Sequence, residues 1–161
     1  MILWGEQMSS RVKRESRVYE MVLAAMFSVI ITICAWITIP FAVPFTMQTF
    51  GIFLAIAVLG GKLATVSIAL YILLGVVGIP VFSGFQGGIG VLFQQTGGYI
   101  VGFLIAAIVC WGIEGCIRKI LVRFCVEKKI WLLALELFLG LLVCYAFGTV
   151  WFWIVYMKKN T

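Results

Sequence analysis

The sequence contains no histidine and no aspartate, and only 11% of its 161 residues are charged. Enzyme sites need a nucleophile with a base, paired carboxylates or a metal, and these groups are too scarce here to assemble one. The same scarcity leads us to expect no metal site and no cofactor. The five cysteines form no Cys-x-x-Cys pair and lie in or beside apolar segments, so no disulfide framework is predicted.

Apolar residues dominate what is present. The chain is 64% hydrophobic with a mean hydropathy of +1.18, which indicates an integral membrane protein. Two uncharged stretches, residues 21–61 and 63–113, exceed the roughly 20 residues of one spanning helix and must fold back. We therefore predict an all-α, polytopic membrane helix bundle with five spans, near residues 21–39, 45–59, 63–79, 96–115 and 130–156.

Prolines and glycines punctuate these spans: Pro40 and Pro80 end two of them, and Gly60-Gly61-Lys62 is a tight turn. The predicted organisation is an N-terminal segment, residues 1–20, one transmembrane domain, residues 21–157, and a tail, residues 158–161. Residues 1–20 carry basic residues and no apolar core, so no cleavable signal is expected and the first span stays in the mature protein.

All but two of the twelve lysines and arginines lie in residues 1–20 or in the turns after the second and fourth spans. Because cytoplasmic loops are enriched in these residues, this distribution predicts a cytoplasmic N-terminus. It also accounts for the net charge of +6 without a nucleic-acid partner. Lys158 and Lys159 conflict with this topology, since five spans would place them outside, as in a chain that stops before a returning span.

The two outer connections, residues 40–49 and 81–99, hold most polar side chains outside the basic turns. Non-helical backbone within a membrane is tolerated where it lines a cavity or is covered by protein. We therefore predict that both connections form one chamber for a small molecule with amide-like and carboxylate groups. Gly97 and Gly98, before an apolar span, would offer helix N-terminal amides to the anionic group. The polar residues are Thr46, Gln48, Thr49, Ser83, Gln86, Gln94, Gln95, Thr96 and Tyr99.

Three blocks in these regions resemble the BioY family, the biotin-specific substrate-capture (S) components of energy-coupling-factor (ECF) vitamin transporters. They are V-P-F-T-M-Q-T-F at 43–50, Y-I-L-L-G-V-V-G-I-P-V-F at 71–82, and G-G-I-G at 87–90 followed by T-G-G-Y at 96–99. The resemblance covers roughly residues 23–152. It implies high-affinity capture of external biotin, with a transmembrane coupling protein and two cytoplasmic ATPases as partners. The chain has no Gly-x-x-x-x-Gly-Lys-Ser/Thr loop, so it cannot supply the ATPase itself.

Candidate binding residues lie in these blocks. Gln48 can donate to and accept from a ureido group, and the Tyr99 ring can stack on an apolar bicycle. Alternatively, Thr46 and Gln48 only cap the second span, and the glycine-rich stretch is an ordinary connection between spans. The predicted binding set is Thr46, Gln48, Phe82, Gly87, Gly88, Gly90, Thr96, Gly97, Gly98 and Tyr99.

Ala24 and Ser28, four residues apart in the first span, form a small-residue pair of the kind that lets membrane helices pack closely. The resemblance implies that this face meets the coupling protein, and packing inside the monomer is the alternative. Glu114 and Glu136 are interpreted as structural, with Glu114 paired to Arg118 one helical turn on.

Two departures from the family pattern leave alternatives open. Gln94-Gln95 stands where the family usually has Gly-Pro, and the sequence ends at Thr161, before a sixth span that in the family begins with a motif like Pro-Gly-Asp-x-x-Lys. The roles of that aspartate and lysine therefore cannot be assigned here. The competing hypotheses are a truncated family member that does not bind biotin and an S component for another small nutrient.

Overall fold

The structure, a computed structural model, describes residues 2–39, 45–94, 96–121 and 129–159. The predicted connection at residues 40–44, Gln95 and the last two residues of the predicted tail lie outside that part of the chain. The described elements are the helices α1 (Ile2–Trp36), α2 (Gln48–Val77), α3 (Gly97–Leu121) and α4 (Lys129–Lys159), the strands β1 (Thr38–Ile39) and β2 (Phe45–Thr46), and the 3-10 turns η1 (Ser83–Phe85) and η2 (Ile89–Phe93). The predicted all-α class is confirmed.

Helix α1 is longer than the predicted first span at one end and shorter at the other. It runs without interruption from Ile2 to Trp36, so the predicted N-terminal segment is helical and continuous with the span. It ends before Pro40, as expected from the restricted backbone of residues that precede proline. Residues 38–39 instead pair antiparallel with residues 45–46, with Thr38 opposite Thr46. This two-stranded ribbon joins the start of α2 to the end of α1.

Helix α2 combines the second and third predicted spans into one element. Within the described residues, the structure has four helices long and apolar enough to cross a membrane, and α2 covers both the second and the third of the five predicted spans. The element is broken at Gly60, whose φ of 77° and ψ of 163° are non-helical and suit a glycine. The predicted turn therefore exists, but it is a single-residue break.

The break at Gly60 reverses the direction of α2. A straight helix of 30 residues would be roughly 45 Å long. Yet Gln48, at its start, lines the same cavity as Phe82, whose ring packs on Gly75 near the other end of α2. The two arms of α2, residues 48–59 and 61–77, must therefore run back along each other.

Glu114 of α3 holds this reversal from the side. Its Oε2 accepts a hydrogen bond of 2.7 Å from the backbone nitrogen of Gly61, at the start of the second arm, where amide groups lack helical partners. The α2 backbone also lies very close to α3 here, because a Cβ at Gly61 would be 2.5 Å from the Cα of Trp111. Glu114 thus has a structural contact with this backbone amide, whereas the side chain of Arg118, its predicted partner, lies outside the described part of the chain.

The second arm of α2 ends in a Schellman-type cap. Gly78 has a φ of 110°, and the nitrogen of Ile79 donates to the carbonyl of Leu74 at 3.1 Å. Pro80 follows directly and cannot continue the helix. The chain then enters the irregular segment that contains η1 and η2.

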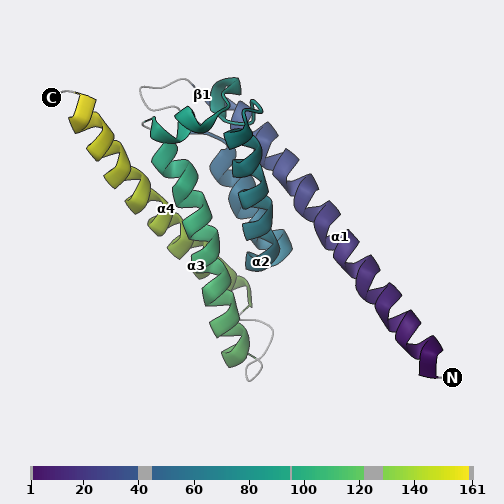
Figure 1. Cartoon of the computed structure of the whole chain (residues 1–161). Coiled ribbons are helices and arrows are strands. Elements are labelled where there is room, and N and C mark those ends of the chain that lie inside the picture. Colours follow the sequence, from purple (N-terminus) through teal and green to yellow (C-terminus); the bar gives the residue numbers. More distant parts are fainter. Residues whose placement is uncertain (1, 40–44, 95, 122–128, 160–161) are drawn as a thin grey trace.

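The helices pack in chain order, with α1 on α2, α2 on α3 and α3 on α4. Figure 1 shows the N-terminus and the turn of α2 toward one end of the bundle, and β1 with the η turns at the other end. The outer connections of the prediction therefore share one end. The outward surface is apolar, as expected for a chain in lipid, with exposed Met26, Val58, Leu73 and Ile108.

Small residues at every fourth position line the contact between α3 and α4. On α3 they are Gly98, Gly102, Ala106 and Cys110, and on α4 they are Gly140, Cys144 and Gly148. A Cβ at Gly102 would lie 3.1 Å from the carbonyl oxygen of Cys144, and one at Gly140 would lie 2.8 Å from the Sγ of Cys110. Small residues let membrane helices approach this closely.

Replacing Gly61 by alanine should loosen the contact between α2 and α3. The added Cβ would meet backbone atoms of Trp111 at 2.5 and 2.7 Å, which cannot move away independently, so we expect a loss of about 2 kcal/mol of stability. Thermal unfolding in detergent measures the effect. The control is Gly112→Ala on α3, where an added Cβ meets nothing within 4 Å. Equal melting temperatures for the two variants would contradict the predicted contact.

Candidate ligand-binding site

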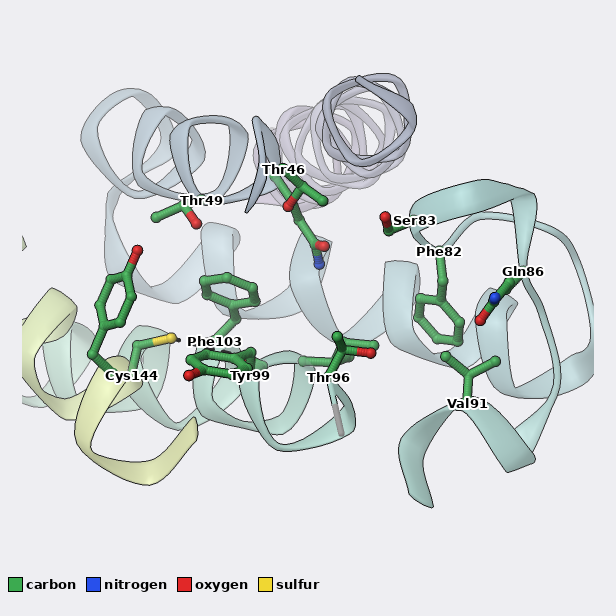
Figure 2. Close-up of a pocket in the computed structure, with 13 residues that line it drawn as sticks. Thr46, Thr49, Phe82, Ser83, Gln86, Val91, Thr96, Tyr99, Phe103 and Cys144 are labelled. Carbon is green, nitrogen blue, oxygen red and sulfur yellow. Dashed lines mark hydrogen bonds between the residues drawn. The ribbon is translucent and has the colours of Figure 1, made fainter. Parts of the chain in front are cut away.

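A cavity of about 230 Å³ lies at the end of the bundle that carries both predicted outer connections (Figure 2). Its walls come from four parts of the chain: the β2–α2 junction, the segment between α2 and α3, the first turns of α3, and α4. The lining residues are Thr46, Gln48, Thr49, Phe82, Ser83, Gln86, Val91, Thr96, Tyr99, Ile100, Phe103, Cys144 and Tyr145.

The cavity wall mixes apolar surface with uncharged polar groups. Figure 2 shows Thr46 and Thr49 on one side, Tyr99 and Phe103 opposite them, and Phe82 farther along the wall. No charged side chain lines the cavity in the part of the chain that the structure describes. Such a lining suits the uncharged, partly apolar portion of a small molecule that has a few hydrogen-bonding groups.

Gln48 is the most informative residue of the wall. It is only 5% exposed, and its Nε2 has no hydrogen-bond partner among the described residues. Leaving a buried donor unsatisfied costs about 1 to 3 kcal/mol. The alternative that Gln48 or Thr46 caps α2 is wrong, because the N-cap residue is Met47 and no side chain caps the helix. The Gln48 amide is thus available to an acceptor on a ligand.

Two aromatic side chains of the wall are each packed against a second aromatic ring. Phe82 is 1% exposed and meets the Tyr71 ring edge-on at a centroid distance of 5.6 Å. Tyr99, on the first turn of α3, meets the Tyr145 ring of α4 at 6.1 Å, also nearly perpendicular. Both predicted aromatic residues therefore lie at the cavity.

The end of α1 holds the segment that supplies Phe82 and Ser83. The Trp36 Nε1 donates to the carbonyl of Pro80 at 3.0 Å, and the Trp36 ring packs on Phe85 at 4.8 Å. The hydroxyls of Thr38 and Ser83 lie 3.0 Å apart and form a hydrogen bond. These contacts link the C-terminal end of α1 and strand β1 to the cavity wall.

The five glycines of the predicted binding set are not among the lining residues of the described chain. Three of them lie at tight contacts, where a Cβ at Gly87 would be 2.6 Å from the carbonyl oxygen of Ile79 and one at Gly97 or Gly98 would collide with Leu92 or Trp151. Gly88 donates from its nitrogen to the carbonyl of Gly75 at 2.7 Å, and Gly90 faces open space. The structure therefore gives most of these glycines a packing role behind the wall.

The predicted anion site at the start of α3 is also partly occupied by the chain itself. The nitrogen of Gly97 donates to the carbonyl of Gln94 at 3.0 Å, and that of Tyr99 donates to the carbonyl of Thr96 at 3.1 Å. The amide of Gly97, which belongs to the predicted anion site, and the neighbouring amide of Tyr99 are therefore not available to a carboxylate.

Ala24 and Ser28, the predicted contact with a coupling protein, are 3% and 1% exposed. Helix α1 packs chiefly on α2, so the chain itself covers both side chains. The structure favours the alternative of packing inside the monomer.

Seven of the nine polar residues noted in the outer connections line the cavity, whereas the binding set predicted from them omitted Thr49, Ser83 and Gln86. Sequence reasoning also missed the apolar wall of Val91, Ile100 and Phe103. It missed α4 altogether, which contributes Cys144 and Tyr145. No local pattern marks these two residues, because they sit in an uninterrupted apolar run and reach the cavity only through the packing of α4 on α3.

The fold defines a polytopic helical membrane protein, and its bundle has a cavity at one end. The model of the BioY family matches residues 8–160, and the chain belongs to that family. The biotin transporter BioY of Thermotoga maritima is 47% identical over 91 residues, which are 56% of this chain and 54% of that protein. The probable biotin transporter BioY of Pyrococcus horikoshii is 39% identical over 133 residues, which are 82% of this chain and 73% of that protein.

A solved structure agrees with these relatives. The crystal structure of the S-component for biotin from an ECF-type ABC transporter superimposes with a TM-score of 0.74 at 25% identity, covering 86% of this chain and 73% of that one. The chain thus spans little more than half the length of the Thermotoga relative and nearly three quarters of the other two proteins.

Replacing Gly87 by alanine should detach the segment between α2 and α3 from the end of α2. The new Cβ would meet the carbonyl oxygens of Ile79 and Gly78 at 2.6 and 2.7 Å, and we expect a loss of at least about 1 kcal/mol. Amide hydrogen exchange across residues 80–94 should become faster. Gly90→Ala, with nothing within 4 Å of its added Cβ, is the matched control and should leave exchange unchanged; faster exchange in both variants would count against this packing role.

Proposed function

We propose that this chain binds biotin and acts as the substrate-specific S component of an ECF-type vitamin transporter. The observation that carries the proposal is the buried, unpartnered amide of Gln48 in the wall of an uncharged cavity. Membership of the BioY family, whose relatives are named as biotin transporters, supplies the ligand. The match to an S-component for biotin supplies the transporter class.

The chemistry of the wall suits the two ends of the biotin bicycle. Its ureido group has one carbonyl acceptor and two N–H donors, and the Gln48 Nε2 would donate to that carbonyl. The hydroxyls of Thr46, Thr49 and Thr96 at the cavity would accept from the N–H groups. The thiolane ring would lie on apolar wall residues, with Tyr99 or Phe82 offering an aromatic face.

Transport needs partners that the chain does not contain. The sequence has no Gly-x-x-x-x-Gly-Lys-Ser/Thr loop, so we propose that it works with a coupling protein and two cytoplasmic ATPases. On this proposal it is a binding and transport subunit, not an enzyme, that needs no cofactor. It lies in the cell membrane with the N-terminus in the cytoplasm, as the distribution of Lys and Arg favours.

Gln48→Ala should weaken biotin binding about tenfold or more, because the ligand loses a buried hydrogen bond worth roughly 1 to 3 kcal/mol. Equilibrium binding of labelled biotin to the purified chain in detergent measures this. The control is Gln94→Ala, since Gln94 is exposed and lies outside the cavity wall although it belongs to the same outer segment. Equal biotin affinities of the two variants would show that Gln48 does not contribute to biotin binding.

The unaltered chain is the reference for the competing hypotheses. Saturable biotin binding by a folded, monodisperse sample supports the proposal. Binding of a different vitamin instead would make the chain an S component for another nutrient. If the folded chain binds neither, this 161-residue sequence does not form a working site alone.

Uptake gives a second, independent prediction. Membrane vesicles that contain the chain with an ECF coupling protein and its two ATPases should accumulate labelled biotin when ATP is supplied on the side of the membrane where the ATPases lie. The chain alone should bind biotin without ATP-driven accumulation. ATP-driven accumulation by the chain alone would contradict the proposal that this chain binds biotin and its partners supply ATP hydrolysis.

A further inference from the structure

Helix α4 holds the Tyr99 side chain of α3 in place from behind the cavity wall. Gly148 of α4 is buried, and a Cβ built on it would collide with the Tyr99 ring. Gly148 itself is not a lining residue, whereas Tyr99 is. The ring thus packs directly on the backbone of α4 on one side and lines the cavity on another.

Two further residues of α4 contact Tyr99 from the same face. The Sγ of Cys144 lies 3.9 Å from the carbonyl oxygen of Tyr99 and donates to it. The Tyr145 ring meets the Tyr99 ring edge-on. Figure 2 shows Tyr99 beside Phe103 and Cys144 on one side of the cavity. With α4 on one side and the cavity on another, a Tyr99 ring displaced from α4 can move into the cavity.

A second contact between α3 and α4 has the glycine on α3 and the large side chain on α4. Trp151 of α4 packs on Gly98 of α3, where a Cβ would collide with its side chain. The Trp151 Nε1 also donates to the carbonyl of Gln94 at 3.3 Å. Tyr99 on Gly148 and Trp151 on Gly98 are therefore reciprocal contacts, each a large side chain over a glycine of the partner helix, and together they set the register of the two helices at the cavity end.

From these contacts we infer that Gly148 is a positioning residue of the ligand site: it leaves the Tyr99 ring room against α4 and so keeps the ring out of the cavity. The inference deepens the proposed function and rests on it for the identity of the ligand. A methyl group at position 148 would push the ring toward the cavity and reduce the space for a ligand. Proteins pack densely enough that one added methyl group has such an effect.

The test is a double-mutant cycle of Gly148→Ala and Tyr99→Ala, measured as biotin affinity and as melting temperature in detergent. With Tyr99 present, Gly148→Ala should weaken biotin binding at least about tenfold and lower the melting temperature by several degrees. In the Tyr99→Ala chain the same change should alter biotin affinity less than about twofold and should not lower the melting temperature, because the colliding ring is gone. A residue that only supports the helix would give equal effects in both chains.

Gly140→Ala is the matched control on the same helix. Gly140 is also buried, and its added Cβ would meet the Sγ of Cys110, away from the cavity wall. It should lower stability without changing biotin affinity. An equal loss of biotin affinity in Gly140→Ala and Gly148→Ala would overturn the inference, as would equal effects of Gly148→Ala in the two Tyr99 backgrounds.

The two readouts separate this inference from the proposed function. The stability cycle needs no ligand, so coupling between positions 99 and 148 supports the positioning role even if the chain fails to bind biotin. In that case only the biotin assignment fails. Additive stability effects would overturn the positioning role even if biotin binds tightly.

Discussion

The reversal of α2 at Gly60 is the constraint on which the site depends. It brings Gln48, from the start of the element, to the same end as Phe82, which follows the end of the element. The reversal is fixed by a backbone conformation that suits glycine and by close contact of Gly61 with α3. The break would leave the backbone amide of Gly61 without a hydrogen-bond partner inside the bundle. The Glu114 carboxylate accepts a hydrogen bond from this amide and so satisfies it.

Much of this architecture is predictable from composition and punctuation. Long uncharged stretches predict the spanning segments, Pro40 and Pro80 predict their ends, and Gly60-Gly61-Lys62 predicts the turn. The tightness of the turn between the two arms of α2 was not predictable, since whether a glycine pair makes a loop or a one-residue break depends on the close contact of Gly61 with Trp111. The extension of α1 to Ile2 was missed because hydropathy identifies membrane-spanning stretches and says nothing about a polar helical continuation.

The candidate site was half predictable. Polar side chains in otherwise apolar surroundings stand out, and Thr46, Gln48, Thr96 and Tyr99 do line the cavity. Glycines were harder to interpret, because the same residue type serves ligand approach and helix packing, and only the neighbours of each Cβ position distinguish these roles. Gly87, Gly97 and Gly98 proved to lie against backbone or side chains of the chain itself. Cys144 and Tyr145 carried no signal, since their contribution arises from tertiary packing.

The composition of the cavity wall has a consequence for assembly. Thr46, Gln48 and Thr49 come from the α1–α2 half, whereas Tyr99, Ile100, Phe103, Cys144 and Tyr145 come from the α3–α4 half. Each half is a pair of neighbouring helices that can form early from local contacts, but neither contains the whole wall. A ligand therefore has full contacts only after the halves have docked. Its binding energy acts across their junction and stabilises the assembled bundle, while it does nothing for either half alone.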